Sequence, residues 1–276
     1  MDYIYGSSPE DYKSYSTEEL RKQFLIENLF SRDEVCWTYT YVDRLLLGGA
    51  CPVNKSLSIG DGKIVGAPTL CSARELGIVN LGGTGSIKVD GVSFDLAKKD
   101  VLYVGRGSKA ITFSSGAPAA PARFLIASSP AGADYPTRLI TAKDSKPLLL
   151  GENKRANVRQ LNMYIHPEVM KSALLMMGVT DLADGSIWNT MPPHTHVRRM
   201  EAYCYFDLEP GDRVLHLMGE AKDTRHLWVG DGQVVVSPAW SIHMGAGTGP
   251  YSFVWIMTGE NQEYTDMQPV AITDLR

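Results

Sequence analysis

The feature that most constrains this chain is a pair of histidines followed by a glutamate, with a further histidine about forty residues downstream. The first group has the spacing H-x-H-x4-E and consists of His194, His196 and Glu201. The second is Pro238-Ala-Trp-Ser-Ile-His243, which follows a valine run at 234–236. Successive side chains of a β-strand alternate between its faces, so the two paired histidines are expected on one wall of a sheet. A turn would then return Glu201 to that wall.

These four residues form a ligand set for a divalent metal ion. Three imidazoles and one carboxylate are borderline nitrogen and oxygen donors that suit Zn²⁺, Fe²⁺, Mn²⁺, Ni²⁺ or Co²⁺. Positions left free at such an ion are available to substrate oxygens, which indicates chemistry. An isolated H-x-H pair more often binds nothing, and the second motif with its own histidine is what favours a metal here.

The two motifs together resemble the cupin signature, in which G-x(n)-H-x-H-x(3,4)-E and P-x-G-x-x-H supply four ligands inside a small antiparallel barrel. Two departures concern the loops. Trp240 stands where that signature has glycine, and the gap from Gly185 to His194 is longer than in the generic motif. All four ligands are nevertheless present.

Composition and charge restrict the kind of partner. The chain has 276 residues, 44% of them hydrophobic, which is enough for a buried core in one large domain or two ordinary ones. Its formal net charge is −4, so neither nucleic acid nor an anionic membrane is expected as a partner. A small ligand is expected instead. The N-terminus lacks a signal-peptide pattern and the cysteines show no disulfide spacing, which predicts a cytoplasmic protein with reduced thiols.

Along the chain, the pattern predicts one clear helix and many short strands. Ser16 and Glu19 form a capping box for a helix over 16–30, which would pack outside a sheet or against another subunit. Asp90-Gly91 is a typical hairpin turn. Short β-rich runs separated by turns predict a sandwich or barrel. The predicted strands are 37–41, 44–47, 77–81, 86–89, 101–104, 110–113, 124–127, 158–165, 172–179, 198–207, 214–218, 225–229, 233–236 and 251–257.

The two halves of the chain can be roughly superposed, with 74–79 aligned to 200–205 and 101–107 to 234–240. We therefore predict a mainly β fold: a duplicated cupin, or bicupin, of antiparallel barrels or jelly rolls with a few short peripheral helices. Residues 1–135 would form an N-terminal half with the leading helix, and 136–276 the metal-binding half.

The N-terminal half is expected to lack a metal. In this superposition Pro68, Leu70 and Ala110 stand where the other half has its three histidines. Only Glu75 matches a ligand, and one carboxylate does not hold a divalent ion against water. This half would then be a degenerate copy that serves as scaffold or interface.

Longer motifs indicate a particular family. They are 188–196, 198–201, 224–226, 237–243 and 259–262, together with Arg74-Glu75-Leu76-Gly77 and the closing 270–276. With these motifs the chain resembles, nearly end to end, the 5-keto-4-deoxyuronate isomerases (4-deoxy-L-threo-5-hexosulose-uronate ketol-isomerases) of pectin breakdown. The 5-deoxyglucuronate isomerases of inositol catabolism share the metal pattern and are the nearest competing activity.

The resemblance implies a zinc enzyme with one Zn²⁺ per chain, assembled as a homohexamer. It implies conversion of 4-deoxy-L-threo-5-hexosulose uronate into 3-deoxy-D-glycero-2,5-hexodiulosonate, an aldose–ketose isomerisation. The family's metal ligands carry over to His194, His196, Glu201 and His243. A metal-dependent oxygenase and a non-catalytic sugar-binding cupin remain as other classes of function. A binding cupin would usually carry a DNA-binding or other effector domain, and no helix-turn-helix pattern accompanies the motifs.

An aldose–ketose shift passes through an enediolate, whose charge a divalent metal stabilises. The base is left open between metal-bound hydroxide and a nearby tyrosine. An arginine is expected to bind the substrate carboxylate, because its planar fork matches both oxygens. Arg198 shares the alternation of the paired histidines, and Arg199 and Arg225 compete with it. Tyr203 and Tyr205 would line the cavity, and Trp240 would be a sugar platform.

Overall fold

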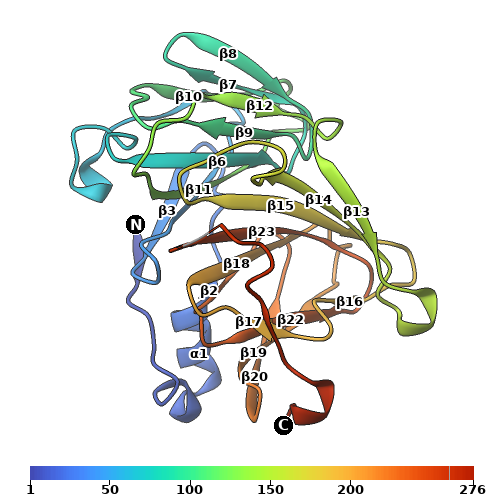
Figure 1. The fold of residues 1–276 in the computed structure, drawn as a ribbon. Helices are drawn as coiled ribbons and strands as arrows, with labels where there is room; N and C mark the ends of the chain where they lie inside the picture. The colour runs from blue at the N-terminus through green and yellow to red at the C-terminus, as the bar shows by residue number, and fades with distance from the viewer. Residues whose placement is uncertain (261) are drawn as a thin grey trace.

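The computed structural model describes residues 1–260 and 262–276, which form two similar β-sandwiches stacked on each other (Figure 1). Each sandwich has one seven-stranded and one four-stranded sheet. We call them the N-terminal and C-terminal sandwiches. A short two-stranded sheet, β17 (His194–Thr195) with β24 (Gln268–Pro269), completes the described β-structure.

In the N-terminal sandwich, antiparallel pairing dominates, and only the edge strand β1 pairs in parallel. The order of the large sheet is β1 (Asp2–Ile4), β3 (Val35–Thr40), β4 (Leu46–Ala50), β11 (Phe124–Pro130), β6 (Arg74–Asn80), β9 (Val101–Val104) and β12 (Arg138–Ile140). The order of the small sheet is β5 (Leu57–Ile59), β10 (Ile111–Ser115), β7 (Gly85–Val89) and β8 (Val92–Leu96).

The C-terminal sandwich repeats this strand order, except that its edge strand β13 pairs antiparallel with β14. The order of its large sheet is β13 (Lys146–Leu150), β14 (Arg159–Ile165), β15 (Met176–Leu182), β23 (Ser252–Gly259), β18 (Arg199–Phe206), β21 (Val234–Ser237) and β2 (Leu25–Ile26). The order of its small sheet is β16 (Trp188–Asn189), β22 (Ile242–Gly247), β19 (Val214–Glu220) and β20 (Asp223–Val229). The predicted duplicated, mainly β cupin is thereby confirmed.

The two sandwiches exchange their last edge strands. β2, from the start of the chain, pairs with β21 of the C-terminal sandwich. β12, which follows the predicted boundary at 135/136, pairs with β9 of the N-terminal sandwich. The division of the chain at 135/136 stays a prediction. The residues that connect β12 to β13 lie after this boundary.

Three apolar clusters match the layers. The largest lies between the two large sheets and joins side chains of both sandwiches, such as Val79 and Leu125 with Val179 and Ile256. A second fills the C-terminal sandwich and a third the N-terminal one. Because one face of each large sheet is buried against the other large sheet, alternate residues of a strand face the interface between sandwiches and the interior of their own sandwich.

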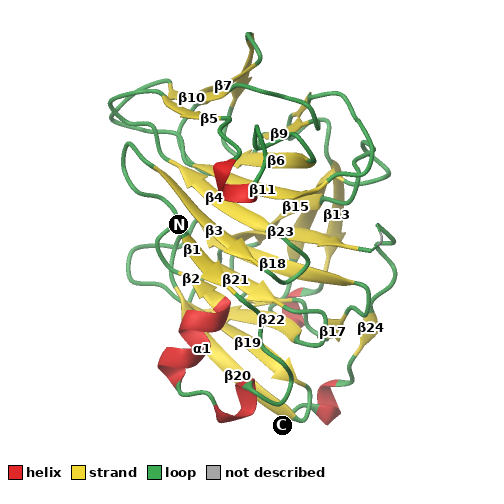
Figure 2. Ribbon diagram, turned by 90° about the vertical axis from the view of Figure 1, so that its left-hand side faces the viewer, coloured by secondary structure: helices red, strands yellow, loops and turns green. Residues whose placement is uncertain are grey.

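The leading helix is shorter than predicted. α1 (Thr17–Phe24) begins with the expected capping box of Ser16 and Glu19, but the chain turns into β2 at Leu25 and does not continue as a helix to residue 30. Pairing with β21 overrides the helical pattern there. α1 packs against the outside of the C-terminal sandwich, beside β20 and β21 (Figure 2).

The other described helices are single 3₁₀ turns at 12–14, 63–65, 153–155 and 272–274. The Asp90-Gly91 hairpin is confirmed, since Val89 pairs with Val92 and both turn residues have positive φ. Every predicted strand overlaps an observed one, with ends that move by a few residues. In the part of the chain that the structure describes, no helix has the length and apolarity to cross a membrane.

Candidate metal centre

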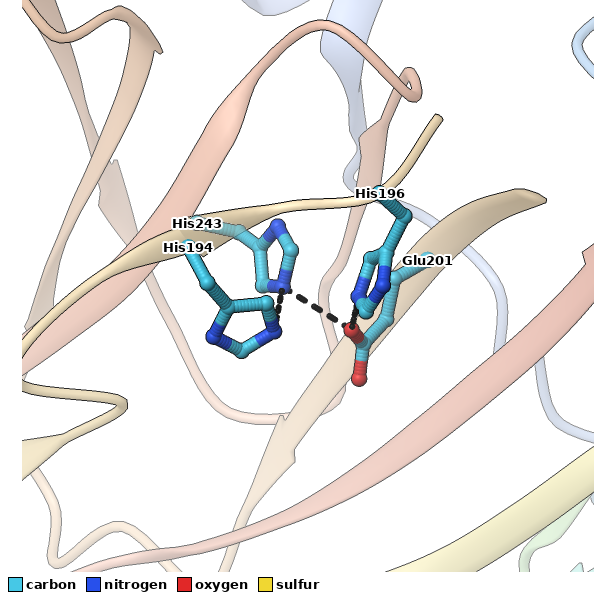
Figure 3. A group of neighbouring side chains, drawn as sticks. All are labelled: His194, His196, Glu201 and His243. Atoms are coloured by element: carbon cyan, nitrogen blue, oxygen red, sulfur yellow. Dashed lines mark hydrogen bonds and ion pairs between the residues drawn. The ribbon is translucent and has the colours of Figure 1, made fainter. Parts of the chain in front are cut away.

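The four predicted donors converge in the C-terminal sandwich (Figure 3). One ligand atom from each lies within 4.8 Å of the others. Glu201 comes from β18 of the large sheet and His243 from β22 of the small sheet, so the centre joins two facing sheets. His194 lies on the short strand β17 and His196 directly after it. The expectation that Glu201 shares one wall with the paired histidines is therefore wrong, because Glu201 comes from β18, in a different sheet from β17.

The spacing of these donors fits one shared ion. Nε2 of His243 lies 3.1 Å from Nε2 of His194 and 2.9 Å from Oε2 of Glu201, and Nε2 of His196 lies 3.0 Å from the same oxygen. Neighbouring ligands bound at about 2.1 Å are themselves about 3.0 to 3.4 Å apart. Three contacts between these donors, at 2.9 to 3.1 Å, agree with that spacing, and the four ligand atoms all lie within 4.8 Å of one another.

The protonation states also suit a metal, because ligands bind as neutral imidazole and carboxylate. Burial, with the neighbouring His243, lowers the pKa of His194 to about 3, so its ring is neutral at neutral pH. Burial alone would raise the pKa of Glu201, but the facing His243 and His196 outweigh it and hold this pKa well below its usual value. Glu201 is therefore ionised although it is 5% exposed.

Outer hydrogen bonds turn the Nε2 atoms toward the shared position. Nδ1 of His196 lies 3.2 Å from Oδ1 of Asp266, and Nδ1 of His243 lies 3.4 Å from both Oγ of Ser237 and the carbonyl oxygen of Ser241. Such partners fix the tautomer and the orientation of a ligating ring. Asp266 also forms an ion pair with Arg199 at 2.7 Å.

A cavity of about 360 Å³ opens in front of three of the donors. This volume is typical of a site for a small molecule. Most of its floor is the inner face of the large sheet, from β14 to β18. The lining residues are Leu148, Leu150, Arg159, Leu161, Thr180, Thr190, Met191, Pro192, His194, His196, Arg199, Glu201, Tyr203, Phe253, Trp255, Met257, Tyr264 and Met267.

Two of the predicted non-ligand site residues lie in this cavity. Arg199 is fully buried and donates to the carbonyl oxygen of Glu263 at 2.8 Å, besides its ion pair. Tyr203 places its hydroxyl 3.0 Å from Oγ1 of Thr190, and burial raises its pKa well above the usual value. Tyr205 shares the face of Tyr203 but lies deeper, where its hydroxyl bonds Nδ1 of His216 at 2.8 Å.

Arg198 and Trp240 lie outside the cavity lining. The strand ends after Thr195, so the alternation that placed Arg198 beside the histidines does not hold; its half-exposed side chain faces Glu260 and Glu263. Trp240 instead fastens the N-terminal segment: its Nε1 donates to the carbonyl oxygen of Ser7, and its ring packs on Tyr12 at 5.0 Å. Arg225 is likewise absent from the lining and bonds the carbonyl oxygen of Lys13.

Sequence reasoning missed Asp266, Arg159 and Tyr264. Arg159 had a detectable signal, because it shares the buried face of its strand with Leu161 and Met163. Asp266 and Tyr264 lie in an irregular segment whose approach to the centre no local pattern indicates. Asn261, part of a motif used for the resemblance, lies outside the described residues.

The superposition of the two halves was wrong by one residue in this strand. Glu201 pairs with Ser237, and the matching pair in the N-terminal sandwich is Leu76 with Val104. Because a slip of one residue moves a side chain to the other face, Glu75 points toward the interface between sandwiches. Glu75 is therefore no remnant of a ligand.

Comparison with known proteins places the chain in a family. The KduI/IolB family matches residues 32–271. A 4-deoxy-L-threo-5-hexosulose-uronate ketol-isomerase 2 of Enterococcus faecalis is 48% identical over 276 residues, which is 100% of both chains. An IolB-like protein of Salmonella typhimurium has a similar structure, with a TM-score of 0.72 at 14% identity, covering 90% of this chain and 96% of that one. Tomato vicilin, at 12% identity, has a TM-score of 0.57 over 80% of this chain and 76% of its own. The resemblance indicated by the sequence motifs is thus confirmed: the chain belongs to the KduI/IolB family.

Proposed function

We propose that this protein is a metal-dependent ketol-isomerase that converts 4-deoxy-L-threo-5-hexosulose uronate into 3-deoxy-D-glycero-2,5-hexodiulosonate during pectin degradation. The observation that carries the proposal is the convergence of three histidines and one glutamate at a small, partly apolar cavity. The full-length relative at 48% identity bears the name of this activity. An intramolecular oxidoreductase needs no second substrate, and the cavity has the size for one sugar.

A metal held by His194, His196, Glu201 and His243 would act as a Lewis acid on the oxygens of the developing enediolate. The protein's own groups hold this centre in place. Asp266 orients His196 and pairs with Arg199, so the guanidinium is fixed beside the donors. Apolar walls such as Phe253 and Met257 exclude water from the intermediate. Tyr203 lines the same cavity, and its hydroxyl lies 3.0 Å from Oγ1 of Thr190.

We further propose Zn²⁺ as the resident metal, one ion per chain, in a cytoplasmic homohexamer. Three imidazoles with one carboxylate suit zinc, although other divalent ions accept the same donors. The hexamer rests on the family resemblance alone. Metal analysis of the purified protein tests the identity and number of the bound ions. Light scattering tests the hexamer.

A second candidate activity is the isomerisation of 5-deoxyglucuronate. It is favoured by the family match, which covers both kinds of enzyme by name, and by the structural likeness to an IolB-like protein. The comparison of kcat/KM for the two acids decides between them. A preference for 5-deoxyglucuronate would assign the chain to the second activity.

The central experiment is incubation of the purified, metal-loaded protein with 4-deoxy-L-threo-5-hexosulose uronate, with the product followed by NMR. We expect formation of the 2,5-diketone without added oxidant or reductant. Absence of turnover together with tight binding would instead support a sugar-binding cupin. A requirement for dioxygen would support an oxygenase.

A further inference from the structure

The cavity wall away from the donors carries buried polar atoms that have no partner in the described protein. Oγ1 of Thr180 and Nε1 of Trp255 both lack a hydrogen bond there, and the two residues are 1% and 2% exposed. Both residues line the cavity. A buried donor without a partner costs about 1 to 3 kcal/mol. This cost is offset where a ligand supplies the acceptor.

A positive charge lies on the same wall. The Arg159 guanidinium donates from Nη1 to the carbonyl oxygen of Asn157 at 2.8 Å and, among the residues the structure describes, makes no ion pair. Arg199 differs, because its charge is neutralised by Asp266 at 2.7 Å. Burial lowers the pKa of Arg159 from its usual value, an effect that the nearby Tyr203 opposes. The free guanidinium is therefore the cavity's available cation.

The register of the sheet places these groups away from the metal donors. Glu201 lies on β18, with β23, β15 and β14 following in order across the sheet. Trp255 pairs with Tyr203 on β18, and Thr180 lies one strand further, opposite Leu161 of β14. Arg159 lies two residues beyond Leu161 on the same strand. The metal donors and Arg159 thus bound opposite sides of one cavity.

Gly178 of β15 lies under the indole of Trp255. A Cβ at this position would meet the indole at 2.0 Å, closer than any real contact. Only a residue without a Cβ lets the ring lie this close to β15, and Trp255 is one of the residues that line the cavity. The indole of Trp255 therefore occupies the space that a side chain at position 178 would need.

We propose that Arg159, Thr180 and Trp255 form the subsite that binds the carboxylate of an acidic sugar while its carbonyl end faces the metal donors. This inference rests on the proposed function for the identity of the reacting end. Guanidinium, hydroxyl and indole N–H are all donors, and a carboxylate accepts from all three. The subsite selects acids over neutral sugars.

The kinetic test uses the metal-loaded enzyme with Arg159→Met, Arg159→Lys, Thr180→Val and Trp255→Phe. We expect Arg159→Met to raise KM for the uronate at least tenfold with unchanged metal content, and Arg159→Lys to recover part of this loss. Thr180→Val replaces a hydroxyl without a protein partner by a methyl group, so it should raise KM several-fold and keep the melting temperature. Trp255→Phe should raise KM several-fold as well but also lower the melting temperature, because the smaller ring leaves a void over Gly178. Arg213→Met, at an exposed arginine, is the matched control. Unchanged KM in Arg159→Met overturns the subsite.

A binding test separates this inference from the proposed function. Calorimetry compares D-galacturonate with D-galactose, which differ in the carboxylate, on the zinc-loaded wild type and on Arg159→Met. We expect the wild type to prefer the acid by at least tenfold and the variant to lose this preference. If the wild type shows this preference but does not turn over the uronate, the subsite stands and the proposed function fails. A wild type without the preference, or a variant that keeps it, overturns the subsite.

Discussion

Leu76 and Glu201 occupy the same place in two similar sheets, yet one packs in an apolar core and the other faces three histidines. The two sandwiches share strand order and layer arrangement. Neither property depends on a metal, because strand pairing and apolar faces form the sheets in both. The candidate metal centre of this chain therefore consists of a few side chains added to a fold whose strand pairing and apolar faces do not need them.

The largest expected effect comes from removing one donor. His196→Ala should lose the bound metal and lower kcat/KM by about 10³ or more, since a Lewis acid supplies several kcal/mol of transition-state stabilisation. The fold should persist. Metal analysis and circular dichroism on the purified variant check both statements. Full activity in a metal-free variant would remove the metal from the mechanism, and two ions per wild-type chain would mean that the N-terminal sandwich also binds metal.

Exchanging the two matching residues tests the comparison directly. Leu76→Glu places an unpaired carboxylate in the N-terminal core and should cost about 3 to 5 kcal/mol of the free energy of unfolding. Glu201→Leu, measured without metal, should be far milder, because it removes a buried charge. Chemical denaturation of both variants gives the values. A Leu76→Glu protein of wild-type stability would show that the two interiors differ more than their topology indicates.

A substitution at Glu75, the residue before Leu76, tests the role of a carboxylate on the opposite face of the same strand. Its carboxylate accepts hydrogen bonds from the backbone N–H groups of Ala173, Leu174 and Leu175 at 2.7 Å each, and from the hydroxyl of Tyr103 at 2.6 Å. Glu75→Ala leaves buried donors without an acceptor and should cost about 3 kcal/mol. Because these bonds join the two sandwiches, we expect loss of stability with unchanged metal content. Loss of metal at retained stability would contradict this role.

The smallest expected effect concerns Trp240. Trp240→Phe keeps an aromatic ring against Tyr12 but removes the bond from Nε1 to Ser7, and should cost about 1 kcal/mol of stability. KM and kcat should stay within twofold of the wild type. Thermal unfolding and steady-state kinetics measure the two quantities. A large rise in KM would restore the sugar platform inferred from the sequence.

Much of the fold was predictable because its signals are local. Strand periodicity, the Asp90-Gly91 turn and the capping box of Ser16 each depend on neighbouring residues. The end of α1 could not be predicted, because the pairing of β2 with β21 joins residues about two hundred positions apart. The one-residue error at Glu75 has a similar cause: a rough superposition does not fix register, and register decides which face a side chain occupies.

For the candidate site, the four donors could be predicted from the sequence, because their residue types and spacing carry the chemistry. The groups that accompany them depend on the tertiary structure. Arg198 and Arg199 are neighbours in sequence, yet one faces solvent and the other is buried beside the donors. Arg159 and Trp255 reach the same cavity from distant segments, and Asp266 reaches the donor His196 from a third. The order of strands in the sheet sets such distances, and no local pattern of residues contains it.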